Sequence, residues 1–314
     1  MCGIVGFSGE WFSSKLEPAL SLIGHRGPDN TAMFRNHRSS VGLGHARLSI
    51  LDTSPDGNQP MISDDGSTAL AYNGEIYNFV ALRQKLIDAG CKFQSGTDTE
   101  VVLKTYLKAR EDGVPINKML QTFNGMFSIA LWDASIQSLY LARDAFGIKP
   151  LYYSETTEGL VFASEIKSFK GFEIDFETVD PAAVENYLTY LWCPGNATPL
   201  SNVKKLGPGE LATVKGGKIT CLKKWSRLPE YRQNKKVKGR RELSVKVSET
   251  LREAVHSQMV SDVPVGAFLS GGLDSSSVVA FARERDPSIQ CFTIIVYLYF
   301  SKFIINYMSM ITFK

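Results

Sequence analysis

A cysteine directly follows the initial methionine, and the next four residues are small or apolar. Loss of Met1 would give Cys2 both a thiol and a free α-amine. The reference pKa values are roughly 8.5 for a thiol and roughly 7.7–8.0 for an α-amine, so the amine can accept the thiol proton near neutral pH. Cys2 is therefore a candidate nucleophile. Taken alone, it could equally be a buried core cysteine at the start of a strand.

Two charged residues further along the chain have the chemistry to bind a free amino acid. Arg47, in HARLSI (residues 45–50), can hold an α-carboxylate through two parallel charge-assisted hydrogen bonds. Asp98, in SGTDTEV (residues 95–101), can receive an α-ammonium group. Such an opposed pair favours a free amino acid over a peptide, although helix capping by Thr97 or Asp98 is the alternative for that segment.

The segment YNGEIYN (residues 72–78) contains hydrogen-bond donors suited to a developing negative charge. The side-chain amide of Asn73 and the backbone N–H of Gly74 can both point at the oxyanion of a tetrahedral intermediate. A type I′ hairpin turn is the alternative for an Asn-Gly pair. The segment HRGPD (residues 25–29) predicts a turn, in which we interpret His25 as structural.

The surrounding sequence predicts the elements that position these groups. Runs rich in Val, Ile, Phe, Tyr and Leu alternate with Gly and Asp turns, and helical segments between them carry apolar residues three and four apart. Strands in runs with helices in pairs predict α+β layers on antiparallel sheets. The expected strands are 2–9, 40–50, 68–78, 125–134, 138–144 and 160–164, and the expected helices are 79–89 and 99–109.

Length and composition limit the classes of protein. A chain of 314 residues usually forms about two domains, because one core rarely exceeds ~250–300 residues. Five scattered cysteines without a C-x-x-C pair indicate neither a disulfide framework nor a zinc site. The N-terminus has no signal-peptide pattern, so we expect a cytoplasmic protein. The basic run 235–241 is interpreted as a solvated linker, and no nucleic-acid partner is expected.

A second chemical motif lies near the end of the chain. LSGGLDSSS (residues 269–277) follows an apolar run and opens a helical pattern, so its backbone N–H groups could face a phosphate at a helix N-terminus. The spacing is not that of the G-x-x-x-x-G-K-[ST] loop. A Ser/Gly-rich turn that only caps the helix is the alternative. The order helix, strand, loop, helix from residue 242 predicts the opening of a parallel α/β unit.

Seven segments, in order, resemble the class II glutamine amidotransferase domain: MCGIVGF, HRGPD, HARLSI, YNGEIYN, SGTDTE, GMFSIALWD and RDAFGIKPLYY. The resemblance implies an α+β N-terminal-nucleophile αββα sandwich with cofactor-free glutaminase chemistry. It implies that Cys2 attacks the glutamine amide to form a thioester, with Asn73 and Gly74 stabilising the oxyanion. The glutamine-binding residues that it implies are Arg47, Leu48, Ser49, Ile50, Asn73, Gly74, Glu75 and Asp98.

The stretch DVPVGAFLSGGLDSSSV resembles the pyrophosphatase loop of ATP-dependent amidotransferases. Together, the two motif sets resemble glutamine-dependent asparagine synthetases. That resemblance implies that ATP with Mg²⁺ activates the β-carboxylate of aspartate, and that ammonia from glutamine then displaces AMP. The implied ATP-binding residues are Leu269, Ser270, Gly271, Gly272, Asp274, Ser275 and Ile294.

We predict four segments: a glutaminase domain (1–215), a linker (216–241), a truncated α/β ATP-pyrophosphatase domain (242–295) and an atypical apolar tail (296–314). After about Ile294 the resemblance ends, and the tail is closer to translated A+T-rich non-coding DNA than to a membrane helix of about 20 apolar residues. We therefore expect a glutaminase that cannot make asparagine.

The expected partners are glutamine, aspartate and ATP, with no membrane, and a homodimer is left open. Two alternatives to the main reading also remain. One is an acceptor carboxylate other than that of aspartate, and the other is a non-functional fragment.

Overall fold

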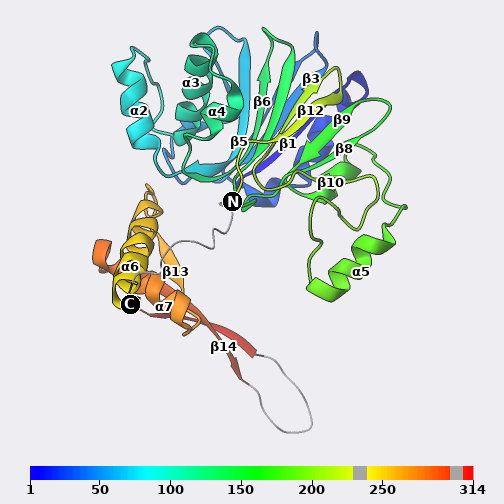
Figure 1. Ribbon diagram of the computed structural model, residues 1–314. Helices are drawn as coiled ribbons and strands as arrows, with labels where there is room; N and C mark the ends of the chain where they lie inside the picture. Colours follow the sequence, from blue (N-terminus) through cyan, green and yellow to red (C-terminus); the bar gives the residue numbers. More distant parts are fainter. Residues whose placement is uncertain (229–238, 298–306, 314) are drawn as a thin grey trace. The chain divides into compact units, whose positions relative to one another are not determined.

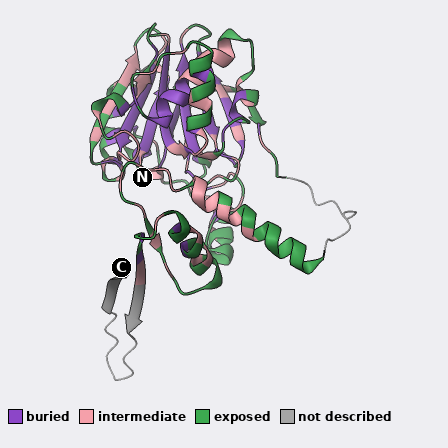
Figure 2. Cartoon of the chain, turned by 90° about the vertical axis from the view of Figure 1, so that its left-hand side faces the viewer, coloured by how far each residue is buried: buried purple, intermediate pink, exposed green. Residues whose placement is uncertain are grey.

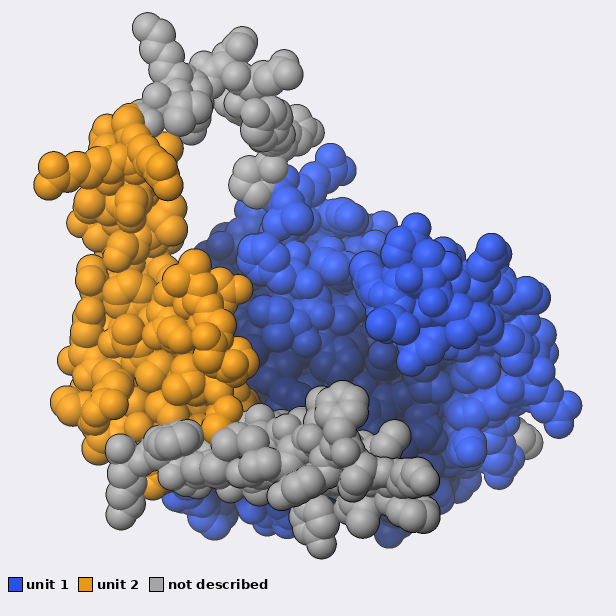
Figure 3. Space-filling view, turned by 90° about the horizontal axis from the view of Figure 1, so that it is seen from below, with its two compact units in different colours: residues 1–229 blue, residues 230–314 orange. Residues whose placement is uncertain are grey.

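The computed structural model describes residues 1–228, 239–297 and 307–313 (Figure 1). The chain divides into two compact units, Met1–Pro229 and Glu230–Lys314, which Figure 3 distinguishes by colour. Each unit has its own sheet or sheets, so each is described by itself.

The first unit contains two six-stranded sheets in which every pair of neighbouring strands is antiparallel. One sheet has the order β10-β8-β9-β1-β3-β2, and the other has the order β12-β11-β7-β6-β5-β4. The first sheet comprises β1 (Gly3–Ser8), β2 (Asn30–Asn36), β3 (Val41–Arg47), β8 (Tyr152–Glu155), β9 (Leu160–Ala163) and β10 (Lys204–Lys205). The second comprises β4 (Met61–Ile62), β5 (Thr68–Ile76), β6 (Gly125–Asp133), β7 (Ser138–Arg143), β11 (Glu210–Lys215) and β12 (Lys218–Lys224).

Helices cover the outer face of each sheet. Helix α1 contacts β1 and β3, whereas α3 contacts β4 and β5 (Figure 1). Helix α1 buries residues three and four apart (Leu16, Ala19, Leu20), as an amphipathic helix on a sheet should. The helices of this unit are α1 (Leu16–Ser21), α2 (Phe79–Asp88), α3 (Asp98–Glu111), α4 (Ile116–Leu120) and α5 (Pro181–Tyr190), with short 3₁₀ turns η1 (Glu10–Lys15), η2 (Gly24–Arg26), η3 (Pro55–Gly57) and η4 (Ile166–Lys170).

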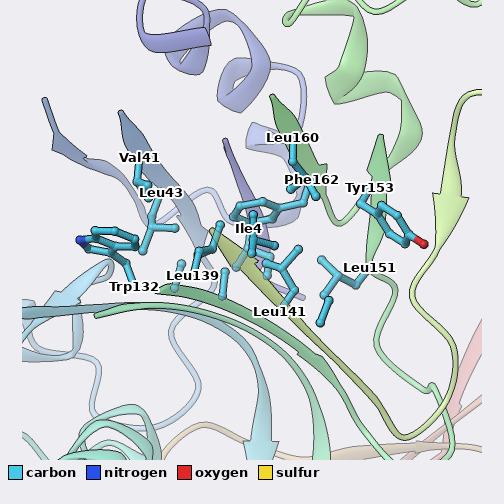
Figure 4. Packing of buried hydrophobic residues seen from close by; sticks show 14 of the residues in the cluster. Ile4, Val41, Leu43, Trp132, Leu139, Leu141, Leu151, Tyr153, Leu160 and Phe162 are labelled. Carbon is cyan, nitrogen blue, oxygen red and sulfur yellow. The ribbon is translucent and has the colours of Figure 1, made fainter. Parts of the chain in front are cut away.

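The core between the two sheets follows from the two-residue period of the strands. Ile4 packs in a cluster with Leu43 of its own sheet and Leu141 of the other sheet (Figure 4). The next residue, Val5, belongs to a separate cluster with Leu16 on the helical side. Because successive side chains of a strand point to opposite faces, both faces of β1 are buried. The layers of the first unit are therefore stacked in the order helices, sheet, sheet, helices.

The six predicted strands and two predicted helices all occur, each within three residues of its expected ends. The sequence did not predict β2, β4, β8, β10 or α5. Strand β2 alternates between exposed and half-buried residues, so its apolar signal is weak.

The structure moves the end of the first unit beyond the predicted residue 215. Strand β12 pairs with β11 through a hairpin at Gly216 and Gly217, both of which have positive φ. Trp225 is buried and stacks on Phe127, with 5.7 Å between ring centroids. Residues 216–225 thus belong to the sheet and its core, because the hairpin completes the second sheet. The rest of the predicted linker lies largely at 229–238, outside the described residues.

The second unit contains α6 (Arg240–Ser257), β13 (Gly266–Phe268), α7 (Leu273–Arg285), β14 (Gln290–Tyr297) and β15 (Tyr307–Phe313). Strand β13 is parallel to β14, as predicted from the order helix, strand, loop, helix, and β15 is antiparallel to β14. The helices are tied by Arg252 to Glu284 (2.8 Å) and by His256 to the carbonyl of Phe281 (2.9 Å). Most of the described residues of this unit are exposed or half-buried, in contrast with the buried strands of the first unit (Figure 2).

None of the helices within 1–228 and 239–297 combines the length and the apolar character needed to cross a bilayer. The predicted apolar tail lies partly outside the described residues, and its last described segment is strand β15.

Candidate active site

A pocket in the first unit brings together residues from five separate parts of the sequence. Four of these parts are the chain start, the end of β3 with its following loop, the second half of β5 and the N-terminus of α3. Lys149, from the loop after β7, adds a fifth. Most of the residues predicted to bind glutamine line this pocket. Its lining residues are Met1, Cys2, Arg47, Leu48, Ile50, Leu51, Gly57, Gln59, Tyr72, Asn73, Gly74, Glu75, Thr97, Asp98, Thr99 and Lys149.

Cys2 is held against the segment that follows β3. The Cys2 sulfur accepts a hydrogen bond from the Leu48 amide (3.3 Å) and lies 3.5 Å from the Leu48 carbonyl oxygen. The guanidinium of Arg26 donates to the Cys2 carbonyl oxygen (2.9 Å). Burial raises the pKa of the Cys2 thiol, and the Leu48 amide acts in the opposite direction. The position therefore needs nearby donors or positive charge to form a thiolate.

Asn73 and Gly74 lie within β5, opposite Ser128 and Phe127 of β6. They do not form a hairpin turn, so that alternative is wrong. Asn73 is 1% exposed, and its amide nitrogen has no hydrogen-bond partner among the residues that the structure describes. Leaving a buried donor unpaired costs about 1–3 kcal/mol, which marks a group kept for another acceptor. A Cβ at Gly74 would lie 2.3 Å from the carbonyl oxygen of Met126, so this strand position requires glycine.

Asp98 is the first residue of α3 and is buried. Its carboxylate accepts hydrogen bonds from the Tyr72 hydroxyl (2.8 Å) and the Ile76 amide (2.9 Å). The cap of the helix is Thr97, whose hydroxyl accepts from the Glu100 amide (3.2 Å). Capping by Asp98 is therefore wrong. Burial raises the pKa of Asp98 to about 6, so a bound ammonium group would be needed to favour its charged form fully.

Arg47 lies at the end of β3, and its guanidinium already has several protein partners. It donates to the carbonyl of Ser54 (2.7 Å) and to the side chain of Asn58 (2.9 Å), and it also contacts the carbonyls of Leu51 and Asp52. Arg47 thus shapes the loop after β3 as well as lining the pocket. Its predicted role as an α-carboxylate clamp stays a prediction.

The remaining predicted residues after β3 differ in placement. Leu48 and Ile50 line the pocket, whereas Ser49 does not. The Ser49 amide instead donates to the carboxylate of Asp29 (2.7 Å), and the Asp29 amide donates to the carbonyl of Arg47 (3.0 Å). The HRGPD segment therefore holds the start of the loop after β3 without lining the pocket itself.

The histidine of HRGPD lies away from the pocket. His25 is half exposed and pairs with Glu165 at 3.1 Å, as a structural residue would. Arg26, which we did not single out from the sequence, binds the same glutamate (2.8 Å) and the Cys2 carbonyl. The position of Arg26 within the same HRGPD segment was its only sequence signal.

Gln59, Tyr72 and Lys149 are among the pocket residues that were not predicted as site residues. The Gln59 side chain accepts from the Tyr72 amide (2.7 Å), and Tyr72 in turn holds Asp98. Lys149 is 5% exposed, and burial lowers its pKa while Glu75 acts in the opposite direction. Burial also raises the pKa of Glu75. The RDAFGIKPLYY segment contains Lys149, but a lone lysine there carried no positional signal.

The second motif forms the turn between β13 and α7, as predicted. The Ser270 and Ser275 hydroxyls lie 3.0 Å apart, and Gly271 has φ +79°. Gly272 is the residue before the helix, and Asp274 lies in its first turn. The turn is exposed and lies at the N-terminus of α7, and its predicted contact with a phosphate stays a prediction.

Two residues of the predicted ATP site, Leu269 and Ile294, lie outside the turn itself. Leu269 precedes the turn, and its amide binds the Phe292 carbonyl (2.8 Å). Ile294 lies in β14, where its backbone pairs with that of Met310, and its side chain lies outside the description. Among the described residues, no group of three or more His, Cys, Asp or Glu side chains forms a metal site.

A family model described as the glutamine amidotransferase domain matches residues 1–226. The chain belongs to this family. A second model, asparagine synthase, matches residues 246–298, so the amidotransferase domain is followed by part of an asparagine synthase domain. These matches confirm the predicted relationship and place the end of the first domain near the structural boundary.

Curated relatives are similar over most of this amidotransferase chain. Asparagine synthetase [glutamine-hydrolyzing] 1 of Bacillus subtilis is 36% identical over 303 residues, which cover 94% of this chain and 46% of the relative. Amidase chry2 of Gibberella zeae is 36% identical over 272 residues, which cover 86% of this chain and 39% of the relative. The chain therefore spans about half the length of the curated relatives it matches, or less.

A solved structure gives the fold independently. Glutamine phosphoribosylpyrophosphate amidotransferase from B. subtilis, complexed with ADP and GMP, superposes with a TM-score of 0.55 at 19% identity and covers 96% of this chain and 68% of that one. Together with the two helix-covered antiparallel sheets, this likeness confirms the predicted N-terminal-nucleophile sandwich.

Proposed function

We propose that the first unit is the glutaminase of a glutamine-dependent asparagine synthetase, with Cys2 as its nucleophile once Met1 is lost. The expectation that the given chain by itself cannot make asparagine stays a prediction. One observation carries the proposal. Within the described residues, a single pocket contains a thiol, a buried amide donor without a hydrogen-bond partner, a buried carboxylate and an arginine. Together these groups supply an attacking atom, an oxyanion donor, and opposed charges for a free amino acid.

The proposed reaction proceeds through a thioester. The Cys2 thiol proton passes to the α-amine of the same residue, and the sulfur attacks the side-chain carbonyl carbon of glutamine. The oxyanion accepts hydrogen bonds from the Asn73 side chain and the Gly74 amide. The C–N bond then breaks, ammonia leaves with the transferred proton, and water hydrolyses the thioester to glutamate. Asp98 and Glu75 would bind the α-ammonium group and Arg47 the α-carboxylate, since all three residues line the pocket.

For the second unit we propose nucleotide binding at the turn between β13 and α7. Ser270, Gly271, Gly272, Asp274 and Ser275 would hold a pyrophosphate group or its Mg²⁺, with Leu269 and Ile294 beside the nucleotide. Bound ATP with Mg²⁺ supplies the activation of a carboxylate, for which aspartate is the proposed acceptor. The similarity to asparagine synthetases over residues 246–298 supports this assignment. We further propose a cytoplasmic location, with no nucleic-acid partner.

Glutamine hydrolysis by the purified chain tests the glutaminase proposal. Intact mass first establishes that Met1 is absent, and glutamate release is then measured. Cys2→Ala should abolish glutamate release, because no other group in the proposed reaction forms the thioester. Cys221→Ala is the matched control, because Cys221 is exposed and does not line the pocket. Unchanged hydrolysis by Cys2→Ala would refute the mechanism.

A further inference from the structure

The loop after β7 is built to place one lysine in the glutamine pocket. The buried carboxylate of Asp144 accepts from the amides of Phe146 and Ile148 (both 3.0 Å) with one oxygen. Its other oxygen accepts from the amides of Lys149 (3.0 Å) and Phe127 (3.2 Å). Four backbone donors on one carboxylate fix the path of the loop up to Lys149.

Arg143 fixes the same loop from its other side. Its guanidinium donates to the carbonyls of Gly147 (2.6 Å), Lys149 (2.7 Å) and Leu206 (2.7 Å). Gly147 has φ +68°, a conformation that favours glycine. Two buried or half-buried charged side chains therefore hold a short loop that contains a buried lysine. So much positioning is difficult to explain by packing alone.

The ammonium group of Lys149 lies next to the first residue of the chain. Among the residues that the structure describes, its only hydrogen-bond partner is the Met1 sulfur, at 3.5 Å. A thioether is a weak acceptor, and loss of Met1 would remove it. The ammonium would then keep its charge in a pocket that it shares with the Cys2 thiol and the Glu75 carboxylate.

We propose that Lys149 is a positioning residue whose ammonium group stabilises the Cys2 thiolate and so sets the pH range in which Cys2 reacts. The proposal rests on the proposed role of Cys2 as nucleophile. Lys149 keeps its own proton throughout, and the thiol proton goes to the α-amine of Cys2. The role of Lys149 is therefore electrostatic, through a positive charge beside a developing negative one.

The other charges around Cys2 decide whether one lysine can matter. Burial raises the pKa of the thiol, whereas the Leu48 amide, the N-terminal amine of Met1, Lys149 and Arg47 lower it, in decreasing order. Glu75 on β5 and Asp144 on the loop favour the charged form of Lys149, and Arg26 disfavours it. Two more ionisable groups of the pocket, Tyr72 and Asp98, are already bonded to each other. Neither of them can carry a positive charge. The cationic side chains that line the pocket are Lys149 and Arg47, and Arg47 already donates to carbonyl oxygens of the loop after β3.

The test is the pH dependence of Cys2 alkylation by iodoacetamide, in which the thiolate displaces iodide. The N-terminal peptide is quantified by mass spectrometry, so that the other four cysteines do not contribute. Lys149→Met removes the charge at similar length, Lys149→Arg retains it, and Lys118→Met is the control, because Lys118 is exposed on α4 and does not line the pocket. Glutamine hydrolysis and thermal unfolding are measured for each variant.

In Lys149→Met the midpoint of the alkylation profile should rise by roughly 0.5–1 pH unit, which is about a three- to tenfold slower reaction at pH 7. Lys149→Arg and Lys118→Met should retain the wild-type midpoint. A wild-type midpoint in Lys149→Met overturns the proposal, even if its KM for glutamine rises. A shift that Lys149→Arg shares with Lys149→Met also overturns it, because the charge would then not be the cause.

The proposed function can fail separately. If the wild-type chain alkylates at Cys2 with a Lys149-dependent midpoint but does not hydrolyse glutamine, the glutaminase assignment fails and the coupling of Lys149 to Cys2 stands. If glutamine is hydrolysed and the midpoint is independent of Lys149, the assignment stands and the present proposal fails.

Discussion

The glutamine pocket of the first unit and the phosphate turn of the second unit are organised in opposite ways. The pocket is built from buried polar groups that are fixed by neighbouring strands and by the loop before Lys149. The turn is exposed, and its hydroxyls bond to each other and to backbone groups of the same turn. A preorganised donor stabilises charge without rearrangement, whereas an exposed turn must exchange water for its ligand. The polar groups of the pocket are therefore held in place by the buried residues around them, whereas those of the turn are not.

The strongest test of this contrast compares one leucine from each unit. Leu43 is 0% exposed between the two sheets, and Leu273 is 83% exposed beside the turn. Leu43→Ala should lower the free energy of unfolding of the first unit by about 2–5 kcal/mol, because it leaves a cavity. Leu273→Ala should change that of the second unit by less than about 0.5 kcal/mol.

The two units can be followed separately in a denaturant titration. Trp11, Trp132, Trp192 and Trp225 are the four tryptophans of the chain, and all lie in the first unit, so their fluorescence reports that unit alone. Amide exchange of α7 peptides reports the second. A loss of stability in Leu273→Ala as large as that in Leu43→Ala would show that the second unit is packed more tightly than its exposure indicates.

The next test removes the unpaired donor of the pocket. Asn73→Ala should lower kcat for glutamine hydrolysis by about 10²–10³-fold, the effect of losing one oxyanion donor, or ~2.7–4 kcal/mol. Thermal stability should change little, because the amide nitrogen has no hydrogen-bond partner to lose within residues 1–228, 239–297 and 307–313. Ser275→Ala is the matched change in the other unit, and its kcat for glutamine should equal that of the wild type. A large drop in melting temperature for Asn73→Ala would instead assign Asn73 a structural role.

The sequence predicted the strands that are buried on both faces and much of the site. Strands β1, β3, β5 and β6 are nearly continuous apolar runs, and the motifs on them contain Asn73 and Arg47. Lys149 could not be predicted, because its position depends on Asp144 and on backbone amides that come together only in the folded loop. The several carbonyl partners of Arg47 were hidden for the same reason.

Glycine shows the same limit of local sequence patterns. A Cβ at Gly57 would lie 2.1 Å from the Arg47 guanidinium, which is a contact between residues ten positions apart. Periodicity and turn preferences describe neighbours in sequence or across a strand pair. They do not report which backbone atoms a buried side chain will meet.

The smallest expected effect concerns Asp98, whose burial raises its pKa to about 6 in the free protein. The ionised carboxylate is the form that holds the α-ammonium of glutamine. Because kcat/KM reports the free enzyme, it should fall about tenfold per pH unit below pH 6 as Asp98 becomes protonated. Asp98→Asn should also lower kcat/KM at pH 7.5. The loss should correspond to roughly 1.5–3 kcal/mol of transition-state stabilisation, the contribution of a hydrogen bond to a charged group.

The acidic limb of the kcat/KM profile tests whether Asp98 is the group that titrates. Asp98→Asn should also flatten the acidic limb of the kcat/KM profile, because no carboxylate remains to titrate at that position. Asp88→Asn, an exposed substitution on α2, should leave that limb in place. If the limb persists near pH 6 in Asp98→Asn, another group controls it, and Glu75, whose pKa burial also raises, becomes the residue to replace next. The contrast between the two units would then stand, but the ammonium contact would belong to β5 instead of α3.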